Sequence, residues 1–261
     1  MLSKNKIKYL TSLSEKKSRT ESMTFLVEGE KMILELMSSN FKVLTLLYTN
    51  KMISAVNSAI IPVHLEKIEI TENESLKISS QKTPQGIFAI VAIPPNFYSE
   101  YFSFPDSLIV ALQDIQDPGN LGTIIRTADW FGIKYVLCSK STADVLNPKV
   151  LQSTMGAVFR VKVIYTNLIE TIKKYKNENP DAPVLAAVLE GENIYKFKSP
   201  KNGLLMMGNE SKGLSPELTQ LATHRLTIPN FGQNGNASES LNVSIATAVI
   251  LSELKRQLIL A

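Results

Sequence analysis

Short apolar runs alternate with helical stretches through the second half of the chain, and this alternation strongly limits the possible folds. The runs cover residues 108–112, 135–138, 184–188, 204–207 and 226–228. Runs of this length that are separated by helices are typical of parallel strands, because each crossover connection lays a helix over the sheet. The sequence therefore predicts an α/β fold with a mostly parallel sheet and helices on both of its faces.

The end of the chain predicts the longest helix, over residues 241–258. Its apolar side chains repeat along one stripe, at Ile245, Val249, Ile250, Leu254 and Leu258. Ser240 stands directly before this segment, and a serine hydroxyl can accept a hydrogen bond from the free amides of a first helical turn. Ser240 is therefore the expected N-cap.

A smaller α/β unit precedes this sheet. Residues 28–37 have apolar side chains at helical spacing, while residues 43–48 and 87–93 are short and strand-like. Two consecutive prolines at 94–95 forbid a continuous helix or a central strand. We therefore expect a small domain over residues 1–95, a linker over residues 96–105 and the main domain over residues 106–261.

Positive charge gathers at the N-terminus. Residues 1–19 contain Lys4, Lys6, Lys8, Lys16, Lys17 and Arg19 against Glu15 alone. This segment carries +5, so the rest of the chain carries about −1 of the total of +4. Such clustering favours contact with nucleic-acid phosphates. The alternative is a solvated, partly mobile terminus without a partner.

Composition excludes several kinds of site. The single cysteine, Cys138, cannot form an internal disulfide, and His64 and His224 stand too far apart for zinc spacing, so no metal is expected. No apolar run approaches the roughly 20 residues that cross a bilayer, and the first residues lack a signal-peptide core. We expect a cytoplasmic protein without a membrane segment.

The first loop with chemical potential follows the run at 108–112. Asp-Pro-Gly-Asn at 117–120 is typical of a turn, and Asn120 is the expected cap of the next helix. Gly122 and Arg126 are four residues apart and share a face of that helix. Arginine suits contact with phosphate, because its planar fork donates two parallel hydrogen bonds.

Two further loops follow later strands. After the run at 204–207, two glycines flank Asn209 and Glu210, although an ordinary strand-to-helix turn could also explain them. Near the last helix, Ser240, Asn242 and Ser244 stand close together. Each could simply satisfy exposed helix-end amides, but three small polar residues exceed what one cap requires.

In this order and spacing, the three loops resemble the SpoU family of the knotted SPOUT methyltransferases. The motifs are Asn120-x-Gly122-x-x-x-Arg126, Gly208-Asn209-Glu210-x-x-Gly213 and Ser240-Leu241-Asn242-Val243-Ser244. This resemblance covers residues 106–261. A weaker one covers the N-terminal unit: Phe25-Leu26-Val27-Glu28-Gly29 and Gln85-Gly86-Ile87 look like the family's small substrate-binding domain, which is similar in fold to certain RNA-binding ribosomal proteins.

The resemblance implies an S-adenosylmethionine-dependent RNA ribose 2'-O-methyltransferase with a C-terminal trefoil knot, working as a homodimer. It points to Gly208, Ile228 and Leu241 as binding S-adenosylmethionine, with Asn209, Glu210 and Asn242 shaping that pocket. Arg126 would be the leading catalytic residue, Asn120 would hold Arg126 or the ribose, and Ser240 with Asn242 would fix the third loop; Glu210 joins this catalytic set. Ribosomal RNA is the expected target. A transfer RNA methyltransferase and a non-catalytic RNA-binding protein are the alternatives.

Some residues stand outside these roles. The segment at 229–239 is roughly four residues longer than the usual family loop, so its extra Asn and Gly are expected to make it more mobile. Asp114 and Asp117 are interpreted as turn residues rather than a catalytic pair. Cys138 is expected to be buried, and Trp130 to pack behind the first motif's helix, with base stacking as the alternative.

Overall fold

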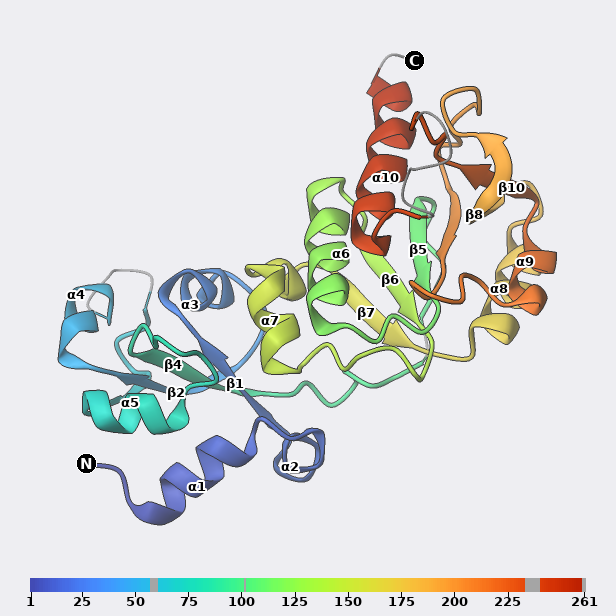
Figure 1. Ribbon diagram of the computed structural model, residues 1–261. Helices are drawn as coiled ribbons and strands as arrows, with labels where there is room; N and C mark the ends of the chain where they lie inside the picture. The colour runs from blue at the N-terminus through green and yellow to red at the C-terminus, as the bar shows by residue number, and fades with distance from the viewer. Residues whose placement is uncertain (57–60, 101, 233–239, 260–261) are drawn as a thin grey trace. The chain divides into compact units, whose positions relative to one another are not determined.

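The computed structural model describes residues 1–56, 61–100, 102–232 and 240–259 (Figure 1). Its contacts divide the chain into two compact units, Met1–Phe97 with Asp144–Arg160, and Tyr98–Ala143 with Val161–Ala261. Residues 144–160 thus group with the N-terminal residues, although the sequence predicted one continuous domain from residue 106. The predicted domain boundaries stay a prediction.

The first unit is a small α/β domain. Its elements are α1 (Lys4–Ser12), α2 (Lys16–Ser22), β1 (Thr24–Glu28), α3 (Glu30–Met37), β2 (Val43–Tyr48), η1 (Asn50–Met52), α4 (Ile53–Val56), β3 (Glu66–Glu69), α5 (Glu72–Ile78), β4 (Ile87–Ala92), α7 (Pro148–Thr154) and η2 (Ala157–Phe159). The strand order is β1-β4-β2-β3, with only β2 and β3 parallel. Leu10 of α1 is buried beside Leu47 and Phe88 of the sheet.

The N-terminal segment of this unit is folded rather than loose. Arg19 is 1% exposed, and its Nη1 donates to the backbone oxygens of Leu13 at 2.7 Å and Ser14 at 2.8 Å. Its Nη2 forms an ion pair with Asp144. Arg19 is therefore a structural residue, and only the lysines of the basic segment remain available to a partner.

The second unit holds a six-stranded parallel sheet. Its elements are β5 (Leu108–Leu112), α6 (Pro118–Trp130), β6 (Tyr135–Cys138), β7 (Lys162–Tyr165), α8 (Leu168–Glu178), β8 (Val184–Asn193), β9 (Gly203–Met207), α9 (Pro216–Leu221), β10 (His224–Thr227) and α10 (Val243–Ile259). The strand order is β10-β8-β9-β5-β6-β7, and each neighbouring pair is parallel. The predicted α/β class is confirmed.

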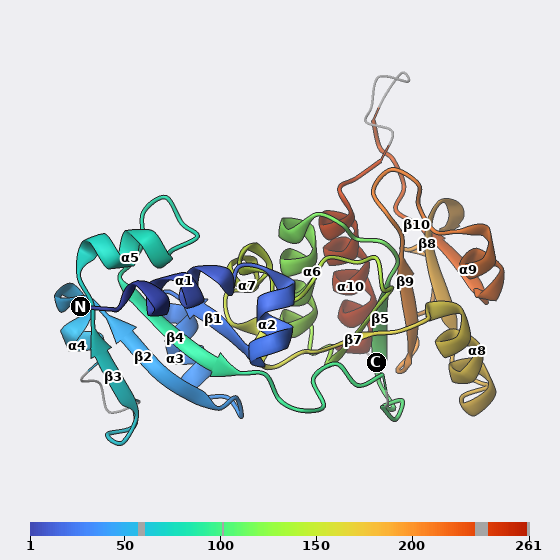
Figure 2. The same cartoon turned by 90° about the horizontal axis from the view of Figure 1, so that it is seen from below.

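Helices cover both faces of this sheet. Figures 1 and 2 show α6 and α10 together on one face, with α8 and α9 on the other. Every residue of β5 and β9 is buried, which explains why these strands are continuous apolar runs. The C-terminal knot stays a prediction, and residues 233–239 of the long loop lie outside the described residues.

Two expectations about helix starts are wrong, and one about packing. Asp117, not Asn120, caps α6, because Pro118 takes the first helical position and the Asp117 carboxylate accepts from the Asn120 amide at 2.8 Å. The last helix begins at Val243, so Ser240 lies too early to cap it. Trp130 is 84% exposed and does not pack behind α6.

Among the described residues, no helix is long and apolar enough to cross a membrane.

Candidate active site

Three loops distant in sequence meet at Asn120. The Asn120 Nδ2 donates to Glu210 Oε1 at 2.8 Å, and the Asn242 Nδ2 donates to Asn120 Oδ1 at 3.0 Å. Asn120 belongs to α6, Glu210 follows β9, and Asn242 precedes α10. Because each residue comes from a different predicted motif, these two hydrogen bonds bring all three motifs into one site.

The loop after β5 is held from both sides by Asp114. This residue has a left-handed backbone, with φ +57°, a conformation that Asp tolerates better than most residues. Its carboxylate accepts from Ser139 at 2.7 Å and from Ser141, while its backbone oxygen accepts from Asn209 Nδ2 at 2.9 Å. Asp114 and Asp117 therefore have structural roles, as expected. Ser139 was not foreseen, because nothing in the sequence connects it to Asp114.

Arg126 is the one cation of the first motif. Its side chain is exposed on α6, two turns into the helix. It has no hydrogen bond or ion pair with any residue that the structure describes. The expected link from Asn120 to Arg126 is not made, since Asn120 bonds Glu210 and Asn242 instead. The guanidinium is thus free to bind an anionic group of a substrate.

The loop after β9 folds back closely on itself. Asn209 and Gly213 exchange backbone hydrogen bonds at 3.1 and 2.9 Å, and Gly213 has φ +68°. The Asn209 Oδ1 accepts from the Ser211 and Lys212 amides at 2.9 and 3.1 Å. A Cβ on Gly208 would lie 2.2 Å from the Gly213 carbonyl carbon. Glycine is therefore required at position 208, because the loop's own returning backbone fills the space that a side chain would need.

Asn242 caps α10 in place of Ser240. Its Oδ1 accepts from the Ser244 amide at 2.9 Å and from the Ser244 hydroxyl at 2.6 Å, and its backbone oxygen accepts from the Ala246 amide at 2.9 Å. Asparagine is among the preferred caps, because its short side chain reaches the free amides of the first turn. The same side chain thus fixes the start of α10 and contacts Asn120.

The positions assigned to S-adenosylmethionine by resemblance lie on separate segments. Gly208 follows β9 and Ile228 follows β10, both half-buried, whereas Leu241 precedes α10 and is 50% exposed. No hydrogen bond joins these three positions within the described ranges. Ser240 is exposed beside Leu241. The half-buried Ile228 offers an apolar wall to a ligand.

Other candidate groups are structural. Cys138 is fully buried, and burial raises the pKa of its thiol. The His224 ring packs against Phe197 at a tilt of 60°, with ring centroids 5.0 Å apart, and its Nδ1 lies 3.9 Å from Glu192. In the described part of the chain, no group of three or more His, Cys, Asp or Glu side chains could hold a metal ion.

Comparison with known families agrees with this geometry. Residues 107–252 match the SpoU rRNA Methylase family, and residues 4–89 match the MRM3-like substrate binding domain. The chain therefore belongs to the SpoU rRNA methylase family, a family of methyltransferases, and the resemblance of its three motifs is confirmed.

Individual relatives extend over nearly the whole chain. The 23S rRNA (guanosine(2553)-2'-O)-methyltransferase RlmP of Bacillus subtilis is 31% identical over 96% of each chain. A structure from Porphyromonas gingivalis, assigned to the TrmH family of RNA methyltransferases, is 39% identical, with a TM-score of 0.85 over 98% of this chain and 99% of its own. An rRNA methyltransferase from Sinorhizobium meliloti with bound AdoMet is 30% identical, with a TM-score of 0.83 over 99% and 97%.

Proposed function

We propose that this chain transfers a methyl group from S-adenosylmethionine to a ribose 2'-hydroxyl of ribosomal RNA. The observation that carries this proposal is that Asn120 donates a hydrogen bond to Glu210 and accepts one from Asn242, on the same helix as the unpartnered Arg126. Family membership supplies the reaction class. The RlmP relative, which spans both parts of this chain, favours ribosomal RNA.

The reaction needs positioning and removal of a weakly acidic proton. S-adenosylmethionine supplies a methyl group on a positively charged sulfur. The ribose 2'-oxygen attacks the methyl carbon, the bond between this carbon and the sulfur breaks, and the hydroxyl proton passes to a phosphate oxygen or water. Arg126 is not the base, because its guanidinium is effectively always protonated. It orients the neighbouring phosphate and the hydroxyl and stabilises the developing negative charge.

The remaining site residues hold the two reactants. In this proposal, Gly208, Ile228 and Leu241 contact the methyl donor, and Asn209 and Glu210 shape its pocket. Asn120, Asn242 and Ser240 keep the third loop against α6. A homodimer, with the site completed near the subunit boundary, and a place in the cytoplasm, where RNA is modified, belong to the same proposal.

The test uses purified full-length protein, labelled S-adenosylmethionine and total RNA. Arg126→Ala should lower methyl transfer by about 100-fold or more, the range for losing one charge-stabilising donor. The matched control is Arg225→Ala, which removes another exposed arginine of the same unit. Near-normal transfer by a folded Arg126→Ala protein would eliminate the assigned role.

The target is tested separately. A tRNA (guanosine(18)-2'-O)-methyltransferase of Aquifex aeolicus is 30% identical, but over only 58% of this chain. Mapping the 2'-O-methyl groups lost when the gene is deleted should therefore identify a ribosomal site. A lost methyl group in transfer RNA would replace the ribosomal target. Binding of S-adenosylmethionine without transfer to any RNA would favour a non-catalytic RNA-binding protein.

A further inference from the structure

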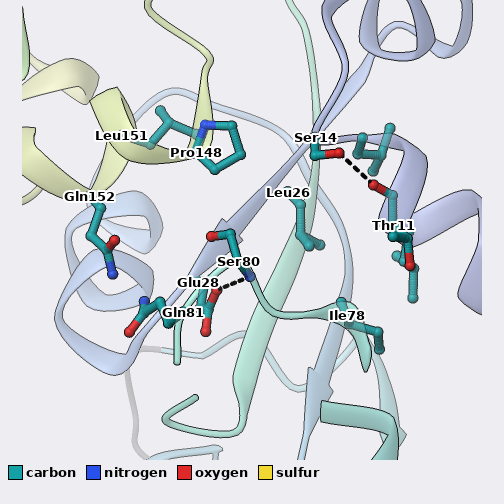
Figure 3. A pocket seen from close by; sticks show the side chains of 12 residues that line it. Thr11, Ser14, Leu26, Glu28, Ile78, Ser80, Gln81, Pro148, Leu151 and Gln152 are labelled. Carbon is teal, nitrogen blue, oxygen red and sulfur yellow. Dashed lines mark hydrogen bonds between the residues drawn. The ribbon is translucent and has the colours of Figure 1, made fainter. Parts of the chain in front are cut away.

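The first unit contains a pocket far from the methylation motifs in sequence. Figure 3 shows the end of α1, strand β1, the segment after α5 and helix α7 around it. The hollow encloses about 440 Å³ when the part open to solvent is included. The room within it for water-sized groups is much smaller, so the edge of a flat ligand fits better than a whole nucleotide.

A carboxylate without a cation sits in this pocket. Glu28 accepts hydrogen bonds from the Ser79 hydroxyl and, at 3.4 Å, from the Ser80 amide. No lysine, arginine or histidine lines the pocket, and Glu28 has no ion pair within the described part of the unit. Burial raises the pKa of Glu28 above its ordinary value, against the opposing hydrogen bonds from Ser79 and Ser80. The pocket therefore repels phosphate and favours a group with N–H donors.

The other walls suit a flat heterocycle. Leu26, Pro148 and Leu151 supply apolar surface. Gln81 and Gln152 lie on the same side as Glu28 in Figure 3, and their side-chain amides have no hydrogen-bond partner among the residues described. Each amide can both donate and accept. Apolar faces with convergent polar groups are typical of sites that read an unstacked base.

Exposed lysines belong to the same unit. Helix α1, whose end lines the pocket, carries Lys4 and Lys8, and α2 carries Lys16 and Lys17. All four are exposed. Lysines outside a pocket hold phosphates without regard to sequence, whereas a group inside it reads the base. The division of charge therefore matches single-stranded RNA, with its backbone outside and one base edge inside.

We propose that this pocket binds an unpaired guanine of the RNA substrate, with the guanine N1–H and N2 amino group donating to the two oxygens of Glu28. Guanine alone among the four bases places two donors side by side on its pairing edge. Adenine and cytosine would turn a ring-nitrogen acceptor toward the carboxylate. This inference rests on the proposed function, because it assigns a specificity residue for the RNA that is methylated.

The test compares labelled uridine heptamers that carry guanosine, inosine or adenosine at the centre, bound to the full-length protein and followed by fluorescence polarisation. Inosine lacks only the N2 amino group. The wild-type protein should bind the guanosine heptamer about tenfold more tightly than the inosine one, within the range of a bidentate base contact. Equal binding of the two by the wild type would overturn the proposal without any variant.

Two variants sharpen this result. Glu28→Gln keeps the shape but removes the charge, and it should bring the guanosine and inosine affinities within about twofold of each other. Glu69→Gln is the control, because it removes one exposed carboxylate from the same unit. Selectivity retained by a folded Glu28→Gln protein would contradict the role of Glu28.

Methyl transfer to total RNA is measured on the same preparations. Transfer without selectivity for guanosine would overturn only the pocket proposal. Selectivity without transfer to any RNA would support the pocket and overturn the proposed function.

Discussion

At Gly208 the backbone approaches the returning chain so closely that only a hydrogen atom fits. An added Cβ would lie 2.2 Å from the Gly213 carbonyl carbon and 2.3 Å from the Leu214 nitrogen. Both neighbours are backbone atoms, which cannot rotate away as a flexible side chain can. Gly208→Ala should therefore open the loop after β9, lowering stability by about 1–3 kcal/mol and weakening S-adenosylmethionine binding by about tenfold or more.

Calorimetric titration and thermal unfolding check this prediction. Gly132→Ala is the comparison, because Gly132 has φ +70° but open space around its Cβ position. It should lose about 1 kcal/mol and keep its affinity for the methyl donor. Unchanged donor binding by a folded Gly208→Ala protein would show that the loop after β9 does not help to bind S-adenosylmethionine.

Glu253 gives part of the stability a pH dependence. Hydrogen bonds from Arg256, at 2.9 Å each, and then from Gln257 lower the pKa of Glu253 to about 2. Because the folded-state pKa lies below the ordinary value of about 4.3, ionised Glu253 stabilises the fold at neutral pH. This contribution is lost as the pH falls from about 4 toward about 2.

Urea unfolding of the wild type and Glu253→Gln across this pH range measures the effect. The wild type should be more stable at pH 7, and the two midpoints should converge in acid. A difference that stays constant with pH would show that the charge of Glu253 is not responsible.

The sequence predicted three of the residues that meet at the candidate site, but not the hydrogen bonds that join them. Motif spacing singled out Asn120, Glu210 and Asn242, yet Asn120 was interpreted as a helix cap. Asp and Asn cap helices about equally well, so side-chain preference does not decide between Asp117 and Asn120. Pro118 was the available signal, because proline is favoured at the first helical position.

Helix α6 depends on its cap to present the site. Asp117 accepts from the Asn120 amide, so losing the carboxylate loosens the turn that carries the Asn120 side chain. Asp117→Ala should lower stability by about 1 kcal/mol and also slow methyl transfer. Asp181→Ala, at an exposed turn of the same unit, is the control. Normal methyl transfer by a destabilised Asp117→Ala protein would show that the cap stabilises α6 but does not position the site residues.

Strands buried on both faces were predictable, whereas marginal ones were not. β5, β6 and β9 are near-continuous apolar runs because helices cover both sides of the sheet. β7 was missed, because only Val163 and Ile164 are buried between Lys162 and Tyr165 at the sheet edge. An edge strand buries fewer residues, so its run of apolar residues is too short to identify from the sequence.

A buried ion pair ties the two pieces of the first unit together. The side chains of Arg19 and Asp144 are 2% and 12% exposed. Asp144→Asn would leave the Arg19 charge buried without its partner and should cost about 3–5 kcal/mol. Glu72→Gln removes half of the exposed Lys51–Glu72 pair and should cost no more than about 1 kcal/mol. Denaturant unfolding compares the two, and equal small losses would show that Arg19 finds another partner.

This pairing could not be predicted from sequence patterns. Periodicity reports which side of an element is buried but not which distant segment buries it. No motif links residues 1–95 to residues 144–160, so only the structure shows that the two segments pack together. The proline pair at 94–95 does lie close to residue 97, where the chain passes from the first unit to the second.

The grouping of residues 144–160 with the N-terminal unit constrains how such enzymes recombine. A gene fusion joined at the linker would carry Arg19 without Asp144, and it would lack the wall of the Figure 3 pocket that Pro148, Leu151 and Gln152 form. To be transplanted whole, the first unit must therefore be encoded as two separate segments, or the recipient must already contain a matching insert between β6 and β7.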